Sequence, residues 1–270
     1  MSQLDLALEA EISARHLSFV ETGRSRPSRE MVLRLAERLD VPLREQNTLL
    51  VAAGFAPVFP ERGLADNALA SARQAVELVV AGHAPYPALA VDRHWTLVSA
   101  NDTAMALMRD ADPTLLVPPV NVLRLSLHQA GLARRIVNLA EWHAHVLERL
   151  RRQIHATADP TLTALRDELA GYARRRSSPP AHSTAAAAPA VVLRIASGDD
   201  VLDFITTTTV FGAPADVTLS ELAIESFFPA NTATATALRR IAENQGRDGD
   251  GGSFPSASAV GRGDATRPVE

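Results

Sequence analysis

Signals that start and stop helices follow one another so closely in the first 54 residues that only short helices fit between them. Ser2 and Asp5 match a capping box, in which the hydroxyl and the carboxylate satisfy amide groups at a helix start. The pattern predicts a helix from about residue 3 to residue 10, with Leu6, Ala7 and Ala10 on one face.

A second helix is predicted to begin after Ser13, a favourable N-cap residue, and to bury Leu17 and Val20. Gly23 is a typical C-cap residue and ends this helix. The remaining side chains form the face that we expect to be exposed, namely Ala14, Arg15, His16, Ser18 and Phe19.

The following stretch, TGRSRPSR, carries Arg24, Arg26 and Arg29 without an acidic residue. Ser28 caps a third predicted helix, which ends at Asp40-Val41-Pro42. Its apolar residues recur at helical spacing, namely Val32, Leu35, Ala36 and Leu39. A fourth helix is predicted over residues 42 to 54.

The composition narrows the function classes. A chain of 270 residues with 46% hydrophobic residues has room for one or two domains, and the absence of cysteine excludes disulfides, zinc–thiolate sites and thiol catalysis. The net charge of -4 means that any contact with nucleic acid must come from a local basic patch. Acidic residues near the start exclude a secretory signal there, and no apolar run reaches membrane-spanning length, so we expect a cytoplasmic protein with no membrane partner.

The order of short helix, tight turn, second helix and arginine-rich turn resembles the helix-turn-helix of the XRE (Cro/repressor-like) family. SQLDLA, ISARHLSFVETGRSRPS and VLRLAERLDVP carry the resemblance. It implies that the second helix lies in the DNA major groove, with base contacts from Ala14, Arg15, His16, Ser18 or Phe19. It also implies phosphate contacts from Gln3, Arg24, Arg26 and Arg29.

Arg15 is the best candidate for base recognition, because a guanidinium can bond a guanine bidentately. The alternative is that Arg15 and His16 simply form a solvated helix face.

Two departures from the family pattern stand out. Glu11 occupies the turn where the family usually has glycine, and a residue with a side chain at positive φ costs about 1 kcal/mol. The resemblance also implies a preceding helix, which is missing here, and Leu4 and Leu8 look like its binding face. Our hypothesis is that Met1 is an internal methionine and that the natural start lies roughly 15–25 residues upstream. The alternative is a truncated motif that binds DNA weakly or not at all.

The Pro- and Gly-containing stretch AGFAPVFPERG, residues 53 to 63, indicates a linker. We expect a DNA-binding domain at residues 1–55, a linker at 56–64, a second domain at 65–244 and a disordered tail at 245–270.

Within the second domain we expect a helix over residues 66–81 with Leu69, Val76, Val79 and Val80 on its apolar side. Two strands follow at 88–91 and 96–100, then an Asn101-capped helix, the extended segment LLVPPVNVLRLSLH, and helices at 133–153 and 160–176. RRRSSPPAHSTAAAAPA is expected to be a mobile loop. Three β-rich runs, VVLRIA, LDFITTTTVF and TLSELAIESFF, precede a last helix over 233–244.

This order predicts an α+β fold, in which an all-α helix-turn-helix domain precedes a PAS-like domain with an antiparallel sheet. The segments PALAVDRHWTLVSAN, NVLRLSLH and AEWHAHVLERLR resemble the MmyB-type regulators over about residues 65–245. The resemblance implies a PAS-like module that holds an apolar, fatty-acid-like ligand between sheet and helices.

The candidate ligand contacts are mostly large apolar side chains, and for the aromatic residues and methionines an ordinary core role is the favoured interpretation. They are Trp95, Met105, Met108, Leu125, Trp142, Phe211 and Phe227. Arg124 is the candidate partner for a ligand carboxylate, but a structural ion pair is the favoured interpretation of this residue.

We expect no metal site and no cofactor. His143 and His145 are two apart on a helix and therefore point in different directions, and no Gly-rich phosphate loop or nucleophile elbow is present. The sequence favours a ligand-responsive transcriptional regulator that binds operator DNA as a homodimer. The alternatives are a ligand- or lipid-binding module without DNA binding and, less favoured, a hydrolase or transferase.

Overall fold

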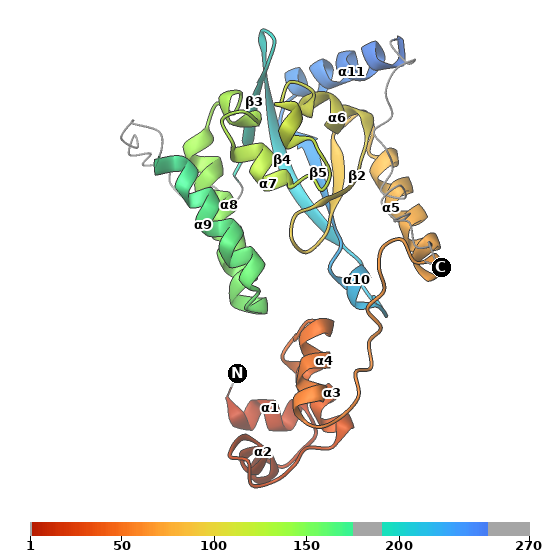
Figure 1. Cartoon of the computed structure of the whole chain (residues 1–270), viewed down its shortest axis with the longest axis vertical. Coiled ribbons are helices and arrows are strands. Elements are labelled where there is room, and N and C mark those ends of the chain that lie inside the picture. The colour runs from red at the N-terminus through yellow and green to blue at the C-terminus, as the bar shows by residue number, and fades with distance from the viewer. Residues whose placement is uncertain (1, 175–190, 248–270) are drawn as a thin grey trace, which may run out of the picture.

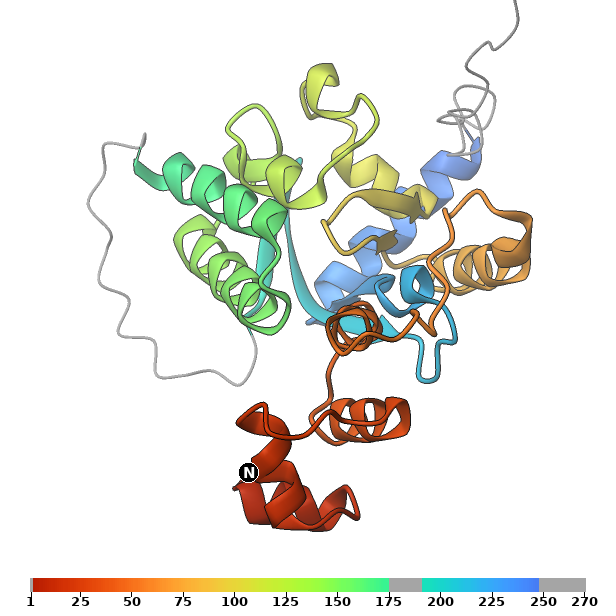
Figure 2. The ribbon, with the colours of Figure 1, turned by 60° about the horizontal axis from the view of Figure 1, so that its bottom comes forward.

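The computed structural model describes residues 2–174 and 191–247. Its first part consists of four short helices, α1 (Gln3–Glu9), α2 (Ala14–Glu21), α3 (Arg29–Arg38) and α4 (Leu43–Ala52). The second part combines an antiparallel sheet with helices (Figure 1), so the α+β prediction is confirmed. Figures 1 and 2 show the N-terminal helices beyond one end of the sheet, with α4 nearest to it.

Side-chain caps start the first three helices as the sequence predicts. Ser2 and Asp5 form the reciprocal capping box of α1. Ser13 accepts the amide of His16 in α2, and Ser28 accepts the amide of Met31 in α3.

The four helices end in the same way, on a residue at positive φ. These residues are Glu11 (φ 55), Gly23 (φ 71), Asp40 (φ 50) and Gly54 (φ 89). In the turn after α1, the Ile12 amide donates to the Ala7 carbonyl and the Glu11 amide to the Leu8 carbonyl, which is the Schellman pattern. The expected strain at Glu11 is therefore present, because a residue with a side chain adopts the conformation that favours glycine.

A small core of mostly short side chains holds the four helices together. Its buried members are Ala7, Ala10, Leu17, Val32, Ala36 and Leu50. The predicted core positions Val20 and Leu35 are only half-buried. Leu39 was predicted to be buried and is 50% exposed, because it lies past the end of α3, where the chain leaves the helical path.

The sheet contains β1 (Ala88–Val91), β2 (Leu97–Ala100), β3 (Leu193–Ser197), β4 (Asp200–Val210) and β5 (Ala223–Pro229). The strand order is β2-β1-β5-β4-β3, and every pairing is antiparallel. Helices cover both faces (Figure 1). They are α5 (Ala70–Gly82), α6 (Asp102–Met108), α7 (Val122–Leu127), α8 (Leu139–Thr157), α9 (Pro160–Arg174), α10 (Val217–Ser220) and α11 (Thr232–Arg247), with 3₁₀ turns at Asn67–Leu69, Pro113–Leu115 and Leu132–Arg134.

Successive side chains of a strand point to opposite faces of the sheet, and each face has its own hydrophobic core. Ala88 and Ala90 of β1 face α5, where Val76 and Val80 are buried. Leu89 and Val91 face the opposite side and join the larger core built with α7, α8 and α9. Val79 was predicted on the buried side of α5 but is 53% exposed. Only a narrow face of α5 contacts the sheet, and the apolar residues of this helix extend beyond that face.

Several predicted elements need correction. NVLRLSLH is mainly helical rather than extended, because Asn121 caps α7 and accepts the amide of Arg124. Its alternating Leu123, Leu125 and Leu127 suggested a strand, but all three are buried around a short helix. In the run TLSELAIESFF only residues 223–228 are strand, since its first residues belong to α10.

Two helices also have bounds that differ from the predicted ones. α8 begins at Leu139 rather than 133, because a 3₁₀ turn and a bridge to β3 come first. α11 continues to Arg247, into the stretch predicted as tail. The predicted loop from 175 to 190 and the tail from 248 lie outside the described residues. Within residues 2–174 and 191–247, no helix is long and apolar enough to cross a lipid bilayer.

The strain at Glu11 leads to a stability prediction. Glu11→Gly should slow amide exchange in α2 about two- to fivefold, because relief of the positive-φ strain stabilises the N-terminal helices by roughly 0.5–1 kcal/mol. Glu9→Gly is the matched control, since Glu9 is exposed at the end of α1 in helical conformation, where glycine costs about 1 kcal/mol. Native-state hydrogen exchange should therefore change in opposite directions. Faster exchange in both variants would contradict the strain argument.

Candidate functional site

The predicted recognition helix α2 and the turn after it present four arginines to solvent. Arg15, Arg24, Arg26 and Arg29 are all exposed. Within the described ranges none of them forms a salt bridge with a carboxylate. The guanidinium of Arg15 lies 5.3 Å from the ring centre of Phe19, one turn along the helix. This face can therefore offer unneutralised positive charge to an anion.

The rest of the predicted contact set is less accessible than expected. Ala14, His16, Ser18 and Phe19 are half-buried, so Arg15 is the only member of the predicted base-contacting set that is exposed. The amide of Gln3 donates to the carboxylate of Glu21, which joins the start of α1 to the end of α2. Leu4 and Leu8 are 59% and 69% exposed, as expected for side chains outside the stripe that faces α2.

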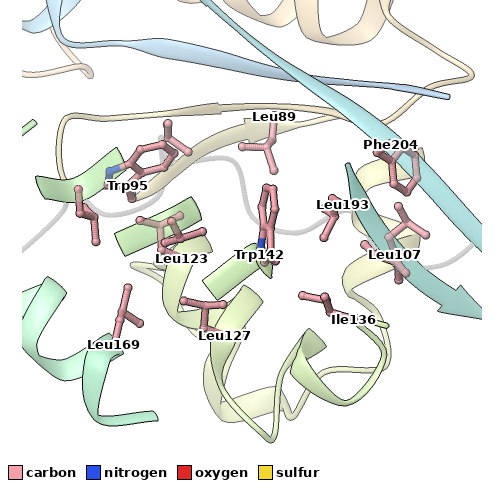
Figure 3. Close-up of a cluster of buried hydrophobic side chains, with 14 of the residues drawn as sticks. Leu89, Trp95, Leu107, Leu123, Leu127, Ile136, Trp142, Leu169, Leu193 and Phe204 are labelled. Atoms are coloured by element: carbon pink, nitrogen blue, oxygen red, sulfur yellow. The ribbon is translucent and has the colours of Figure 1, made fainter. Parts of the chain in front are cut away.

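A second candidate site is a cavity between the sheet and α7–α8, with a volume of about 90 Å³. Figure 3 shows Leu89 and Leu193 from the sheet facing Trp142 and Leu123 from the helices across this region. The wall is almost entirely apolar, and both tryptophans of the chain, Trp95 and Trp142, belong to it.

Five of the eight predicted ligand contacts line this cavity, namely Trp95, Met108, Leu125, Trp142 and Phe227. The other three point elsewhere. Met105 packs in a neighbouring cluster, and Phe211 packs with the core beneath α5. Arg124 forms a bidentate ion pair with Glu168 of α9, at 2.7 and 2.8 Å, which matches the structural alternative.

The polar end of the cavity was not predicted. Arg149 of α8 donates to both carboxylate oxygens of Glu225 of β5, at 2.9 and 2.6 Å. The hydroxyl of Thr208 donates to Glu225 as well, at 3.0 Å. The Glu225 side chain is only 5% exposed, and that of Arg149 is 31% exposed. The sequence did contain an indication of this ion pair. Arg149 lies on the same face of α8 as the buried Trp142 and Val146, and a charged side chain on a buried face requires a partner.

Both tryptophans are fixed by their indole N–H groups. Trp95 donates to Gln153 at 3.0 Å, and its ring lies 4.5 Å from the guanidinium of Arg149. Trp142 donates to Ser126 at 2.8 Å. Trp95 has a φ of 67, a strained conformation for an aromatic residue in a cavity wall.

His145 stacks on Trp142 with ring centres 5.3 Å apart. Burial, followed by the nearby charges of Arg149 and Arg152, lowers the pKa of His145 below its usual value. The imidazole is therefore mainly uncharged at neutral pH.

The segment that roofs the cavity is attached to both edges of the sheet. On the β2 edge, the Leu97 amide donates to the Val120 carbonyl and the Val122 amide to the Trp95 carbonyl. On the β3 edge, the Val137 amide donates to the Arg194 carbonyl at 2.8 Å. The intervening chain, which includes α7, therefore spans the face of the sheet and closes the cavity.

An ion-pair network joins the N-terminal helices to the sheet. Arg44 of α4 binds both oxygens of Glu221, which directly precedes β5, at 2.6 and 3.0 Å. It also binds Glu61 at 2.6 Å, and these hydrogen bonds raise the pKa of Arg44, that of Glu221 most. Arg93, in the turn between β1 and β2, lies 3.8 Å from both Glu221 and Asp159. We call Arg44, Glu61, Arg93 and Glu221 the interdomain network.

The predicted linker is attached at both ends. The Asn47 side chain of α4 accepts the amides of Val58 and Phe59. The Pro60 carbonyl accepts the amide of Val217 in α10 at 2.9 Å. The segment therefore has defined contacts with α4 and with α10.

Two family models match the chain. One, described as the MmyB-like transcription regulator ligand binding domain, matches residues 72–241, which include the cavity. The other, described as helix-turn-helix, matches residues 1–46, which include α2 and the arginine turn. No curated protein matches the chain.

The interdomain network can be tested by amide exchange. Arg44→Gln should raise exchange in residues 57–63 and 216–222 about tenfold, because hydrogen bonds between charged groups stabilise by roughly 1.5–3 kcal/mol. Arg240→Gln is the control, since Arg240 pairs with Asp200 elsewhere on the surface. Unchanged exchange in the Arg44→Gln protein would show that the network does not hold the two parts together.

Proposed function

The chain belongs to the MmyB-like transcription regulators, which combine a DNA-binding helix-turn-helix with a ligand-binding domain, and we propose that its α2 reads operator DNA while the cavity between sheet and α7–α8 senses an apolar ligand. In this proposal residues 1–55 bind DNA, residues 56–64 form the linker between the two domains, and residues 65–244 bind the ligand.

The DNA half of the proposal rests on one observation, namely that Arg15, Arg24 and Arg26 of α2 and its turn are exposed and form no salt bridge with a described carboxylate. In a chain with a net charge of -4, such a patch supplies the attraction to phosphates that the whole molecule lacks. Arg15 lies on α2 and is the residue for base contact, whereas Arg24, Arg26 and Arg29 lie in and after the turn, where they suit phosphates. Gln3 is also proposed to contact a phosphate, and its amide would then have to turn from the Glu21 carboxylate to which it donates.

We propose further that two copies bind together. A helix-turn-helix dimer reads two half-sites about one helical turn apart, so the operator is a pseudo-palindrome. A binding site selected from random duplexes should therefore show two-fold symmetry.

The ligand half rests on the apolar wall of the cavity. Its lining by Leu, Ile, Phe and Trp side chains suits an acyl or alkyl chain, in keeping with a fatty-acid-like ligand. A volume of about 90 Å³ holds only a few non-hydrogen atoms, whereas drug-sized ligands occupy roughly 300–1,000 Å³. A longer ligand must therefore displace side chains such as Met108, whose thioether chain repacks easily.

Strand β5 offers a route from the cavity to α4. Glu225 faces the cavity, and Glu221, just before the same strand, binds Arg44 of the helix-turn-helix part. A second connection runs from Trp95 in the cavity wall to Gln153, which donates to the carbonyl of Arg93 in the interdomain network. Ligand binding that shifts β5 or Trp95 would alter the position of α4, and a few kcal/mol of differential affinity would make it regulatory.

Two substitutions test the placement of α2 on DNA. Arg15→Ala should cut the preference for a selected duplex over a scrambled one by about 1–3 kcal/mol. Arg26→Ala should weaken binding to both duplexes equally and lower the slope of log K against log salt by about 1. Fluorescence anisotropy at several salt concentrations measures both quantities, and Arg240→Ala is the control.

Equal effects of Arg15→Ala and Arg26→Ala would mean that α2 does not read bases. If the wild-type chain binds no duplex even at low salt, the DNA half of the proposal fails. A ligand-binding module without DNA binding is then the function that remains.

A further inference from the structure

The charge of the cavity is balanced within the cavity itself. Among the described side chains that line it, Arg149 and Glu225 are the two with full charges, and they bind each other. His145, the third titratable group, stays mainly uncharged at neutral pH because burial lowers its pKa. A ligand therefore meets an apolar space whose net charge is zero.

Glu225 offers no net negative charge to a cationic ligand, because Arg149 already neutralises it, and it also opposes an anionic one. Its two oxygens already accept hydrogen bonds from Arg149 and from Thr208. A ligand carboxylate that approached Arg149 would lie beside the buried carboxylate of Glu225, and the two negative charges would repel. Separation of the pair would leave a charge buried without a partner, which strongly destabilises a protein.

We propose that this pocket selects ligands in an electrically neutral form, such as a long-chain alcohol, ester or amide, and discriminates against carboxylates and ammonium ions. This inference rests on the proposed function, since it names the ligand class for the same cavity. A fatty acid would bind only as the protonated acid. Glu225 and Arg149 are then the residues that determine ligand specificity through their charges.

The test uses three six-carbon probes that differ only in charge, hexan-1-ol, hexanoate and hexylammonium, at pH 7.5. Both tryptophans of the chain line the cavity, so intrinsic fluorescence reports binding directly. The wild-type protein should bind hexan-1-ol at least tenfold more tightly than either ion. Lowering the pH towards the pKa of hexanoic acid should strengthen hexanoate binding but not hexan-1-ol binding.

Three variants give a charge series. Glu225→Gln leaves the pocket with one positive charge and should raise hexanoate affinity relative to hexan-1-ol at least tenfold. Arg149→Gln leaves one negative charge and should do the same for hexylammonium. The double variant Arg149→Gln, Glu225→Gln restores neutrality without a buried charge, so it should fold, retain hexan-1-ol and favour neither ion.

The outcomes separate the inference from the proposed function. The neutral-ligand inference is overturned if the wild-type protein binds hexanoate with an affinity equal to or higher than that for hexan-1-ol at pH 7.5. The proposal of an apolar-ligand pocket would then still stand. Absence of any fluorescence response to all three probes, in the wild-type protein and in the double variant, overturns the ligand half of the proposed function and the inference with it. If a single variant does not fold, the wild-type preference and the double variant still decide between these results.

Discussion

The structure depends on the pairing of β5 with strands on both of its sides. β5 pairs with β1 along one edge and with β4 along the other, so the order β2-β1-β5-β4-β3 cannot form without it. Because side chains alternate along the strand, Glu225 and Phe227 face the cavity while Ile224 packs beneath α5. The chain enters β5 through Glu221, which binds Arg44. One strand therefore fixes the sheet, the polar end of the cavity and the contact with the DNA-binding helices.

Several arginines of the linker and the sheet-containing part form ion pairs, whereas those of α2 and the turn after it do not within the described part of the chain. In the sheet-containing part, Arg62, Arg93, Arg124, Arg135, Arg149 and Arg194 each form an ion pair with a carboxylate. These pairs hold the connecting segments, α7 and β3 in place. On α2 and its turn, Arg15, Arg24 and Arg26 have no such partner among the described residues. Charge that is neutralised internally attracts a phosphate less strongly, and this difference supports the proposed DNA contacts of α2 and its turn.

Much of the fold could be predicted because its signals are local. Ser13 and Asn101 cap the helices that they were expected to cap, and β1 covers the predicted residues 88–91. What could not be predicted depends on partners distant in sequence. Glu225 is 76 positions from Arg149, and nothing near either residue indicates the other. The segment with Leu123, Leu125 and Leu127 of α7 was predicted to be extended, because a short helix buried on several sides shows no clear helical period in its sequence.

The lining of the cavity could also be predicted only in part from the sequence. Trp95, Trp142 and Phe227 were selected for their size and apolarity and do line the cavity, but Phe211 has the same character and lies on the other face of the sheet. Which face a side chain occupies depends on strand register, which the sequence alone leaves open.

A cavity smaller than its expected ligand makes the roof part of the regulatory mechanism. The roof is bonded to the β2 edge through Val120 and Val122 and to the β3 edge through Val137, so it cannot lift without loss of these hydrogen bonds. Ligand binding must then be accommodated by side chains or by movement of β5 and the strained Trp95, both of which connect to the interdomain network. In the proposed mechanism, a roof held at both edges of the sheet would direct the displacement towards α4. A ligand small enough to fit without displacement would bind and yet transmit nothing, because it would not distinguish between two arrangements of the protein.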